Sequence, residues 1–280
     1  MKWTPGGRSG NLEDRRSSGG MGAGLGIGGT VVVLALSLLF GRNLFSDLGV
    51  EPAVGTGGGG PMSAADSARE EPEVQFVSYV LDDVQKTWGN TLRQYNVQYQ
   101  PAKLVLFRNS TQSGCGTAQS AMGPFYCPLD EKVYIDLGFY DELKQRFGAE
   151  GDFAQAYVLA HELGHHVQHL DGVDQKVRQM QESNPDVANA LSVRMELQAD
   201  CYAGIWAHST NERQILSAGD VEEAMNAASA VGDDRIQAQT RGRVNVDSFT
   251  HGSAAQRAQW FKRGFDSGDP KACDTFQGVG

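Results

Sequence analysis

Residues 160–170 read AHELGHHVQHL and hold four of the six histidines in the chain. The apolar spacing over residues 153–173 predicts a helix that ends near Gly172. On that helix His161 and His165 lie one turn apart and face the same way, with their Cβ atoms about 5–6 Å apart. Two imidazoles at this spacing can bind one Zn²⁺. The stretch therefore has to fold as a largely buried helix with one face open to a metal ion.

Glu162 directly follows the first of these two histidines. The resulting His-Glu-x-x-His pattern is typical of a site in which the glutamate is a general base and not a ligand. Zinc lowers the pKa of a bound water to about 7, and a neighbouring carboxylate can take its proton as that water attacks a carbonyl. A helix whose histidines only fill the core is the simpler alternative. The spacing favours the metal site and predicts Glu162 as the catalytic base.

A catalytic zinc site takes three protein ligands and leaves one position open. One known extension of the motif supplies a third histidine, but Gln168 and Asp171 stand where that extension has Gly and His. Glu196, in the later segment MELQAD, is the predicted third ligand instead. A solvated helix face is the alternative for Glu196, but the segment is mainly apolar and a buried carboxylate needs a partner. Asp200, one turn later, is predicted to accept the other ring N–H of a ligand histidine.

His251 lies in FTHGSAAQRAQWF, where a loop enters a helix. We predict that it stabilises the oxyanion of a tetrahedral intermediate, a role that often falls to a histidine or tyrosine donor. Its alternative role is packing at the helix start, with Ser253 as the N-cap. Arg257 could form an ion pair. Packing, capping or outer contacts are expected for the remaining histidines, which are His166, His169 and His208.

Residues 21–40 carry no charge, and twenty helical residues match a hydrocarbon core of roughly 30 Å. Basic residues precede this run at Lys2, Arg8, Arg15 and Arg16, so the positive-inside rule predicts a cytoplasmic N-terminus with the rest of the chain across the membrane. A cleaved signal peptide is the alternative, although no small-x-small cleavage site follows. The expected organisation is a disordered cytoplasmic N-terminus at 1–20, a transmembrane helix at 21–40, a flexible linker at 41–72 and a folded domain at 73–280.

The folded domain is expected to be α+β, mainly helical with a small sheet. Helical spacing marks residues 74–88, and helices are also expected at 220–230 and 253–266. Residues 102–107 and 132–137 read as short strands. The formal net charge of −10 offers no broad basic surface, which argues against a nucleic-acid partner.

All four cysteines follow the predicted span, and an even number outside the cytoplasm suggests two disulfides. Three pairings are possible. We expect Cys115–Cys127 and Cys201–Cys273, because the first pair brackets one glycine-rich loop. A zinc cluster of cysteines is the rival interpretation, but no Cys-x-x-Cys spacing supports it.

Several motifs together resemble the bacterial putative neutral zinc metallopeptidase family. They are GGRSGNLEDRR, GCGTAQSAMGPFYCPLDEKVYID, HELGHHVQ, ELQADCYAGIWAH and HGSAAQR. The resemblance implies metal and catalytic roles for His161, Glu162, His165 and Glu196, one zinc ion, and a zincin-like fold with a glutamate as third ligand. It also implies a strand along the cleft with which an extended peptide could pair. KVYID at 132–136 is the candidate, although it could equally be a central strand.

The resulting expectation is a membrane-anchored zinc endopeptidase that acts on a protein or peptide substrate. It would be a single-pass protein of the bacterial inner membrane, attached through residues 21–40, with its catalytic domain periplasmic or extracellular. A non-catalytic zinc-binding or scaffold module of the cell envelope is one alternative, against which the presence of Glu162 argues. A zinc amidase acting on cell-wall peptides is another, because it would attack a carbonyl with the same water.

Overall fold

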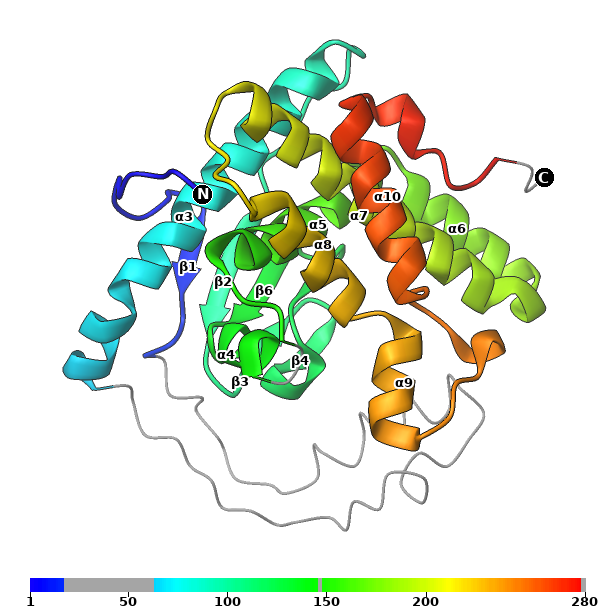
Figure 1. Ribbon diagram of the computed structural model, residues 1–280, viewed down its shortest axis with the longest axis horizontal. Coiled ribbons are helices and arrows are strands. Elements are labelled where there is room, and N and C mark those ends of the chain that lie inside the picture. The colour runs from blue at the N-terminus through cyan, green and yellow to red at the C-terminus, as the bar shows by residue number, and fades with distance from the viewer. Residues whose placement is uncertain (18–62, 146–147, 278–280) are drawn as a thin grey trace.

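The computed structural model describes residues 1–17, 63–145 and 148–277. The helices are α3 (Ala64–Arg93), α4 (Gly138–Gln145), α5 (Asp152–Leu170), α6 (Val173–Ser183), α7 (Ala188–Glu212), α8 (Asp220–Ala230), α9 (Asp233–Arg241) and α10 (Ala254–Ser267). The strands are β1 (Leu12–Asp14), β2 (Lys103–Phe107), β3 (Ser110–Ser113), β4 (Gly116–Gln119), β5 (Phe125–Cys127) and β6 (Lys132–Asp136). The expectation of a mainly helical α+β domain with a small sheet is confirmed (Figure 1).

The main sheet has the strand order β1-β2-β6-β5. Strands β1, β2 and β6 run parallel, and β5 is antiparallel at the edge. Strands β2 and β6 are buried along most of their length, as expected for central parallel strands that are covered on both faces. The segment KVYID is therefore the central strand β6, and its assignment as the cleft strand is wrong. A separate hairpin of β3 and β4 lies in the segment where only a loop was expected.

Helices α7 and α10 pack backbone to backbone. A Cβ atom built on Gly264 of α10 would lie 1.9 Å from the carbonyl oxygen of Cys201 on α7. One built on Gly204 of α7 would lie 2.0 Å from the carbonyl oxygen of Phe261. Only glycine at both positions permits this approach, and both contacts lie in the C-terminal half of α10.

Both expected disulfides are present. Cys115–Cys127 joins the turn of the β3–β4 hairpin to β5, with Cα atoms 5.8 Å apart. Cys201–Cys273 joins α7 to the short 3₁₀ helix η4 (Pro270–Cys273), with Cα atoms 5.6 Å apart. The second bridge fixes the C-terminal turn against the helix that carries Glu196 and Asp200.

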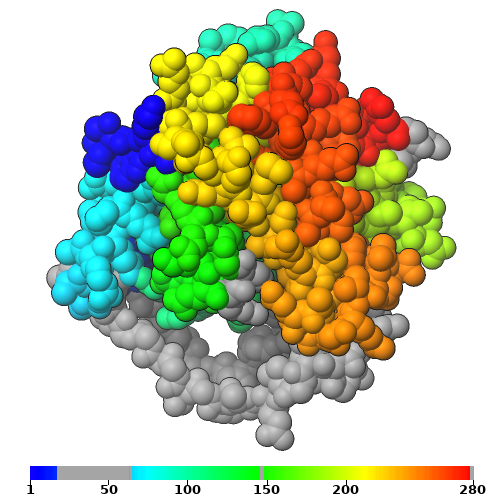
Figure 2. Space-filling view, in the orientation of Figure 1, coloured from blue at the N-terminus to red at the C-terminus, as the bar shows by residue number. Residues whose placement is uncertain are grey.

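The N-terminal residues form part of the folded domain, so the expectation of disorder is wrong for residues 1–17. Strand β1 pairs with β2, with Leu12 opposite Leu104. Arg16 is 3% exposed and donates to Glu70 of α3 at 2.8 Å. Lys2 N donates to the carbonyl of Ile215, so the segment bridges α3 and the turn after α7 (Figure 2).

The helix α3 begins earlier than the expected end of the linker at residue 72. Ser63 caps it by accepting from Asp66 N, and the helix continues through Pro72. Glu70 and Glu71, in this polar first part, pair with arginines of the N-terminal segment. The Ser63 N-cap and these ion pairs both stabilise the start of the helix.

The pairing of β1 with β2 has a consequence for membrane topology. Two strands of one sheet have to lie on the same side of any membrane. The expected arrangement, with residues 1–20 in the cytoplasm and the domain across the membrane, is therefore incompatible with this fold. Within the described ranges no helix is long and apolar enough to cross a bilayer. The predicted span at 21–40 lies outside the described residues.

Single-cysteine labelling tests this shared side. Thr4 and Asn211 are both exposed, and the four native cysteines are held in disulfides. We expect Thr4→Cys and Asn211→Cys, each in the full chain, to be labelled alike by a membrane-impermeant maleimide in intact cells. Labelling of one position and protection of the other would show that the N-terminal segment and the domain lie on opposite sides.

Candidate metal site

The structure brings the three predicted ligands together. His161 and His165 of α5 and Glu196 of α7 each offer one ligand atom within 4.8 Å of the other two. His161 Nε2 lies 3.2 Å from Glu196 Oε2, and His165 Nε2 lies 3.4 Å from Glu196 Oε1. Two imidazole nitrogens and one carboxylate oxygen are the donor set of many catalytic zinc sites, so these residues fit the metal that the motif predicts.

Gly164, within the motif itself, allows this convergence. A Cβ atom built there would lie 3.0 Å from the carbonyl oxygen of Ala199 on α7. Such a contact is tighter than nine in ten real Cβ contacts, so a larger residue would require the backbone of α7 to move by a few tenths of an ångström. Glu196 lies one turn before Ala199, so this close contact between the helices lies next to the point where its carboxylate meets the histidines.

Glu162 lies beside the three ligands and is 8% exposed. Burial raises the pKa of its carboxyl, and the two neighbouring histidines oppose that rise. A raised carboxyl pKa is the direction that suits a general base working near neutral pH. His161, Glu162, His165 and Glu196 all line one cavity of about 730 Å³.

Asp200 is fully buried and contacts His161 as predicted, with Oδ1 2.8 Å from the ring Nδ1. Arg257 of α10 donates to Asp200 Oδ2 from Nε at 2.8 Å, and the Tyr157 hydroxyl donates to Oδ1 at 2.5 Å. Burial alone would raise the pKa of Asp200, but Arg257 and His161 hold it below its ordinary value. Asp200 is therefore a paired carboxylate that orients the His161 ring.

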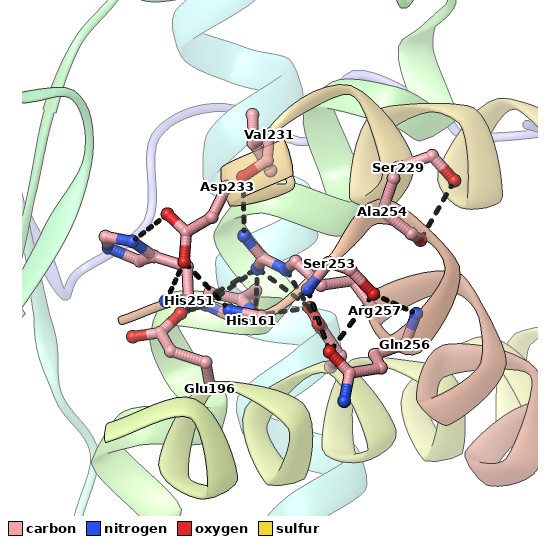
Figure 3. A network of polar contacts seen from close by, with 12 residues as sticks. His161, Glu196, Ser229, Val231, Asp233, His251, Ser253, Ala254, Gln256 and Arg257 are labelled. Atoms are coloured by element: carbon pink, nitrogen blue, oxygen red, sulfur yellow. Dashed lines mark hydrogen bonds and ion pairs between the residues drawn. The ribbon is translucent and has the colours of Figure 1, made fainter. Parts of the chain in front are cut away.

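Arg257 is the residue whose role was least evident from the sequence. It is 4% exposed, and its Nη2 lies 3.8 Å from Glu196 Oε2 in addition to its contacts with Asp200. Figure 3 shows the Arg257 side chain reaching toward His161, with Glu196 and the Asp233–His251 pair nearby. The ion pair suggested for Arg257 exists, but its partner could be found only from the packing of α10 on α7.

His251 lies at the loop before α10 and lines the same cavity as Glu162. Its Nδ1 is 3.2 Å from Asp233 Oδ1, and this contact raises the pKa of His251. Asp233 also accepts the backbone N–H groups of Thr250, His251 and Gly252, which fixes the loop. Sequence reasoning missed Asp233. Its position at the start of a helix gave no sign of a contact eighteen residues away.

The other histidines have structural contacts. His166 is fully buried between the Tyr126 hydroxyl and the Gln100 carbonyl. His169 pairs with Asp174, and His208 contacts the carbonyl of Phe265. Ser253 caps α10 in a capping box with Gln256, as expected.

Strand β5 is the edge strand beside the site. Phe125 and Tyr126 line the cavity, and the Tyr126 hydroxyl contacts His166 of α5. Apolar side chains from several other elements line the rest of the cavity, including Val158, Val177, Met195 and Ile236.

Comparisons with known proteins show the family to which the chain belongs. A family model described as Putative neutral zinc metallopeptidase matches residues 1–276. The uncharacterized protein YpfJ of Escherichia coli (strain K12) is 49% identical over 288 aligned positions, which cover 99% of both chains. The uncharacterized protein Rv2575 of Mycobacterium tuberculosis (strain ATCC 25618 / H37Rv) is 48% identical over 189 positions, 64% of this chain and 63% of that one. No solved structure matches the chain.

Removal of one ligand histidine tests the metal assignment. We expect the purified chain to hold about one zinc ion, and His165→Ala to hold far less, because two protein ligands do not complete a catalytic site. Metal content measured by mass spectrometry checks this. His208→Ala, which removes a histidine outside the site, should leave the zinc content unchanged. A full complement of zinc in His165→Ala would contradict the ligand assignment.

Proposed function

Because the chain belongs to the putative neutral zinc metallopeptidase family, we propose that it is a zinc-dependent endopeptidase that hydrolyses peptide bonds of a protein or peptide substrate. The observation that carries this proposal is the convergence of His161, His165 and Glu196 beside the buried Glu162 on one cavity. A zinc module without turnover would have no use for a carboxylate base at this place.

The residues around the site have distinct roles in this proposal. Bound zinc would act as a Lewis acid and lower the pKa of a water molecule. Glu162 accepts the proton of the attacking water and passes it to the leaving nitrogen, a role that its raised pKa favours. Asp200 accepts the N–H of His161 and holds that ring toward Glu196.

His251 is proposed to stabilise the developing oxyanion of the substrate. Asp233 accepts from its Nδ1 and raises its pKa, which favours the doubly protonated ring. The imidazolium can then donate from Nε2 into the cavity while Nδ1 stays bound to Asp233. Asp233 is thus a positioning residue for His251.

An extended substrate could pair with the edge of β5 by strand addition. This strand lines the cavity next to α5, so a peptide bound there would lie beside the metal ligands. The apolar lining from Val158, Val177 and Ile236 offers contacts to apolar substrate side chains.

We also propose that the domain works outside the cytoplasm, in the periplasm or at the cell surface. Two disulfides support an oxidising compartment. With β1 paired to β2, the N-terminal segment lies on the same side as the domain.

Glu162→Gln tests the hydrolytic mechanism. We expect it to bind zinc normally but to lose about 100-fold or more of its activity on an unfolded protein substrate, since the amide cannot accept the proton. Glu182→Gln makes the same change at an exposed position of α6 and should keep full activity. Full activity in Glu162→Gln would show that Glu162 is not the general base.

The pH profile of Asp233→Asn tests the role of His251. If His251 acts in its protonated form, activity is present below its pKa and is lost as the pH rises through it. Loss of the Asp233 charge lowers the pKa of His251, so the alkaline limb of kcat/KM should move to lower pH. Asp234→Asn is the control, because Asp234 caps Ala254 N instead. An unchanged alkaline limb of kcat/KM in Asp233→Asn would exclude the proposed action of Asp233 on His251.

A further inference from the structure

The two ligand histidines are supported in different ways. The Nδ1 of His161 meets a carboxylate, that of Asp200, whereas the Nδ1 of His165 lies 2.8 Å from the amide oxygen of Gln168. Gln168 is fully buried, one turn after His165 on the same helix. It belongs to the HELGHHVQ motif, yet neither metal binding nor proton transfer assigns it a role.

The orientation of the Gln168 amide follows from its other partners. Its Nε2 lies 2.8 Å from the carbonyl oxygen of Met195 and 3.0 Å from Gln198 Oε1. A backbone carbonyl can only accept, so Nε2 has to face Met195 and Oε1 has to face His165. That oxygen in turn can only accept, so Nδ1 of His165 carries the hydrogen. The lone pair is then on Nε2, the atom that faces Glu196.

Gln198 extends this chain to the C-terminal turn. Its Nε2 donates to the carbonyl of Cys273 at 3.1 Å, which again can only accept. Gln198 Oε1 therefore has to face Gln168. Cys273 is held to α7 by its disulfide with Cys201. A relay of hydrogen bonds thus runs from the metal ligand His165 to a covalently fixed turn, and each amide has one possible orientation.

An uncharged relay also suits the charge balance of the site. Glu162, Glu196 and Asp200 already place three carboxylates there. A fourth buried carboxylate would carry a large desolvation cost without a further partner, and a glutamine avoids it.

We propose that Gln168 is a positioning residue that selects the Nδ1–H tautomer of His165 for metal binding, and that Gln198 acts through Gln168 by fixing its amide. The inference rests on the proposed metal site but not on peptide hydrolysis. It makes the Cys201–Cys273 turn part of the support of the metal site.

Zinc affinity of the full chain, measured by competition with a chelator, tests the relay. Gln168→Leu should bind zinc about 10–100-fold more weakly, the usual effect of losing a partner of a ligand histidine. Gln198→Leu should lose less, because Met195 still orients Gln168. The double variant should bind no more weakly than Gln168→Leu, since Gln198 acts only through Gln168.

The tautomer itself provides a second readout in the metal-free protein. Long-range ¹H–¹⁵N spectra should show His165 protonated on Nδ1 in the wild type and a mixture of tautomers in Gln168→Leu. Gln85→Leu, at a similarly buried glutamine of α3, is the control and should change neither the zinc affinity nor the tautomer of His165. If Gln168→Leu does not fold, Gln198→Leu should still show weaker zinc binding and a partial loss of the Nδ1–H signal.

Unchanged zinc affinity and an intact Nδ1–H signal in Gln168→Leu would overturn the relay, as would additive losses in the double variant. Absence of zinc binding in the wild type would overturn both the metal site and the relay. Wild-type zinc binding without hydrolysis, accompanied by the expected losses in the variants, would support the relay and count only against the peptidase.

Discussion

The close approach of α7 to α5 and to α10 brings the residues of the candidate site together. Gly164 lets α7 come near α5, and Gly264 lets α10 come near α7. The first contact sets the distance from the ligand histidines to Glu196, and the second brings Arg257 to Asp200. A larger residue at Gly264 would clash with the backbone of α7, whereas one at Gly164 would require a shift of a few tenths of an ångström. The Gly264 contact is therefore a structural condition for the packing that pairs Arg257 with Asp200.

Two buried carboxylates at the site differ in a way that fits different roles. Asp200 is paired with Arg257 and His161, and its pKa stays below the ordinary value. Burial raises the pKa of Glu162. A carboxylate that remains ionised can hold a ring in place, and one with a raised pKa can exchange a proton near neutral pH. The difference between Asp200, which holds the His161 ring, and Glu162, the proposed base, thus comes from their surroundings and not from their residue type.

The N-terminal segment joins the domain through charges that looked like a topology signal in the sequence. Arg8 and Arg16 pair with Glu71 and Glu70 of α3. The positive-inside rule treats such arginines as free to interact with the membrane surface, but here they are committed to ion pairs. Residues 1–17 therefore form one folded unit with the domain that carries the candidate metal site.

The sequence by itself determined the features that depend on local spacing. His161, Glu162 and His165 share one helical turn, and their relation follows from helix geometry alone. The two central strands and helices α5, α8 and α10 were also predicted within a few residues, because their periodicity is local, whereas α3 starts ten residues before the predicted helix. Only the tertiary structure decided which residues far apart in the chain meet: the strand pairing of residues 12–14, the edge position of β5, and the partners of Arg257, Asp233 and Gln168. These contacts depend on how helices and strands pack, and a periodic pattern shows which face of an element is apolar but not which element covers it.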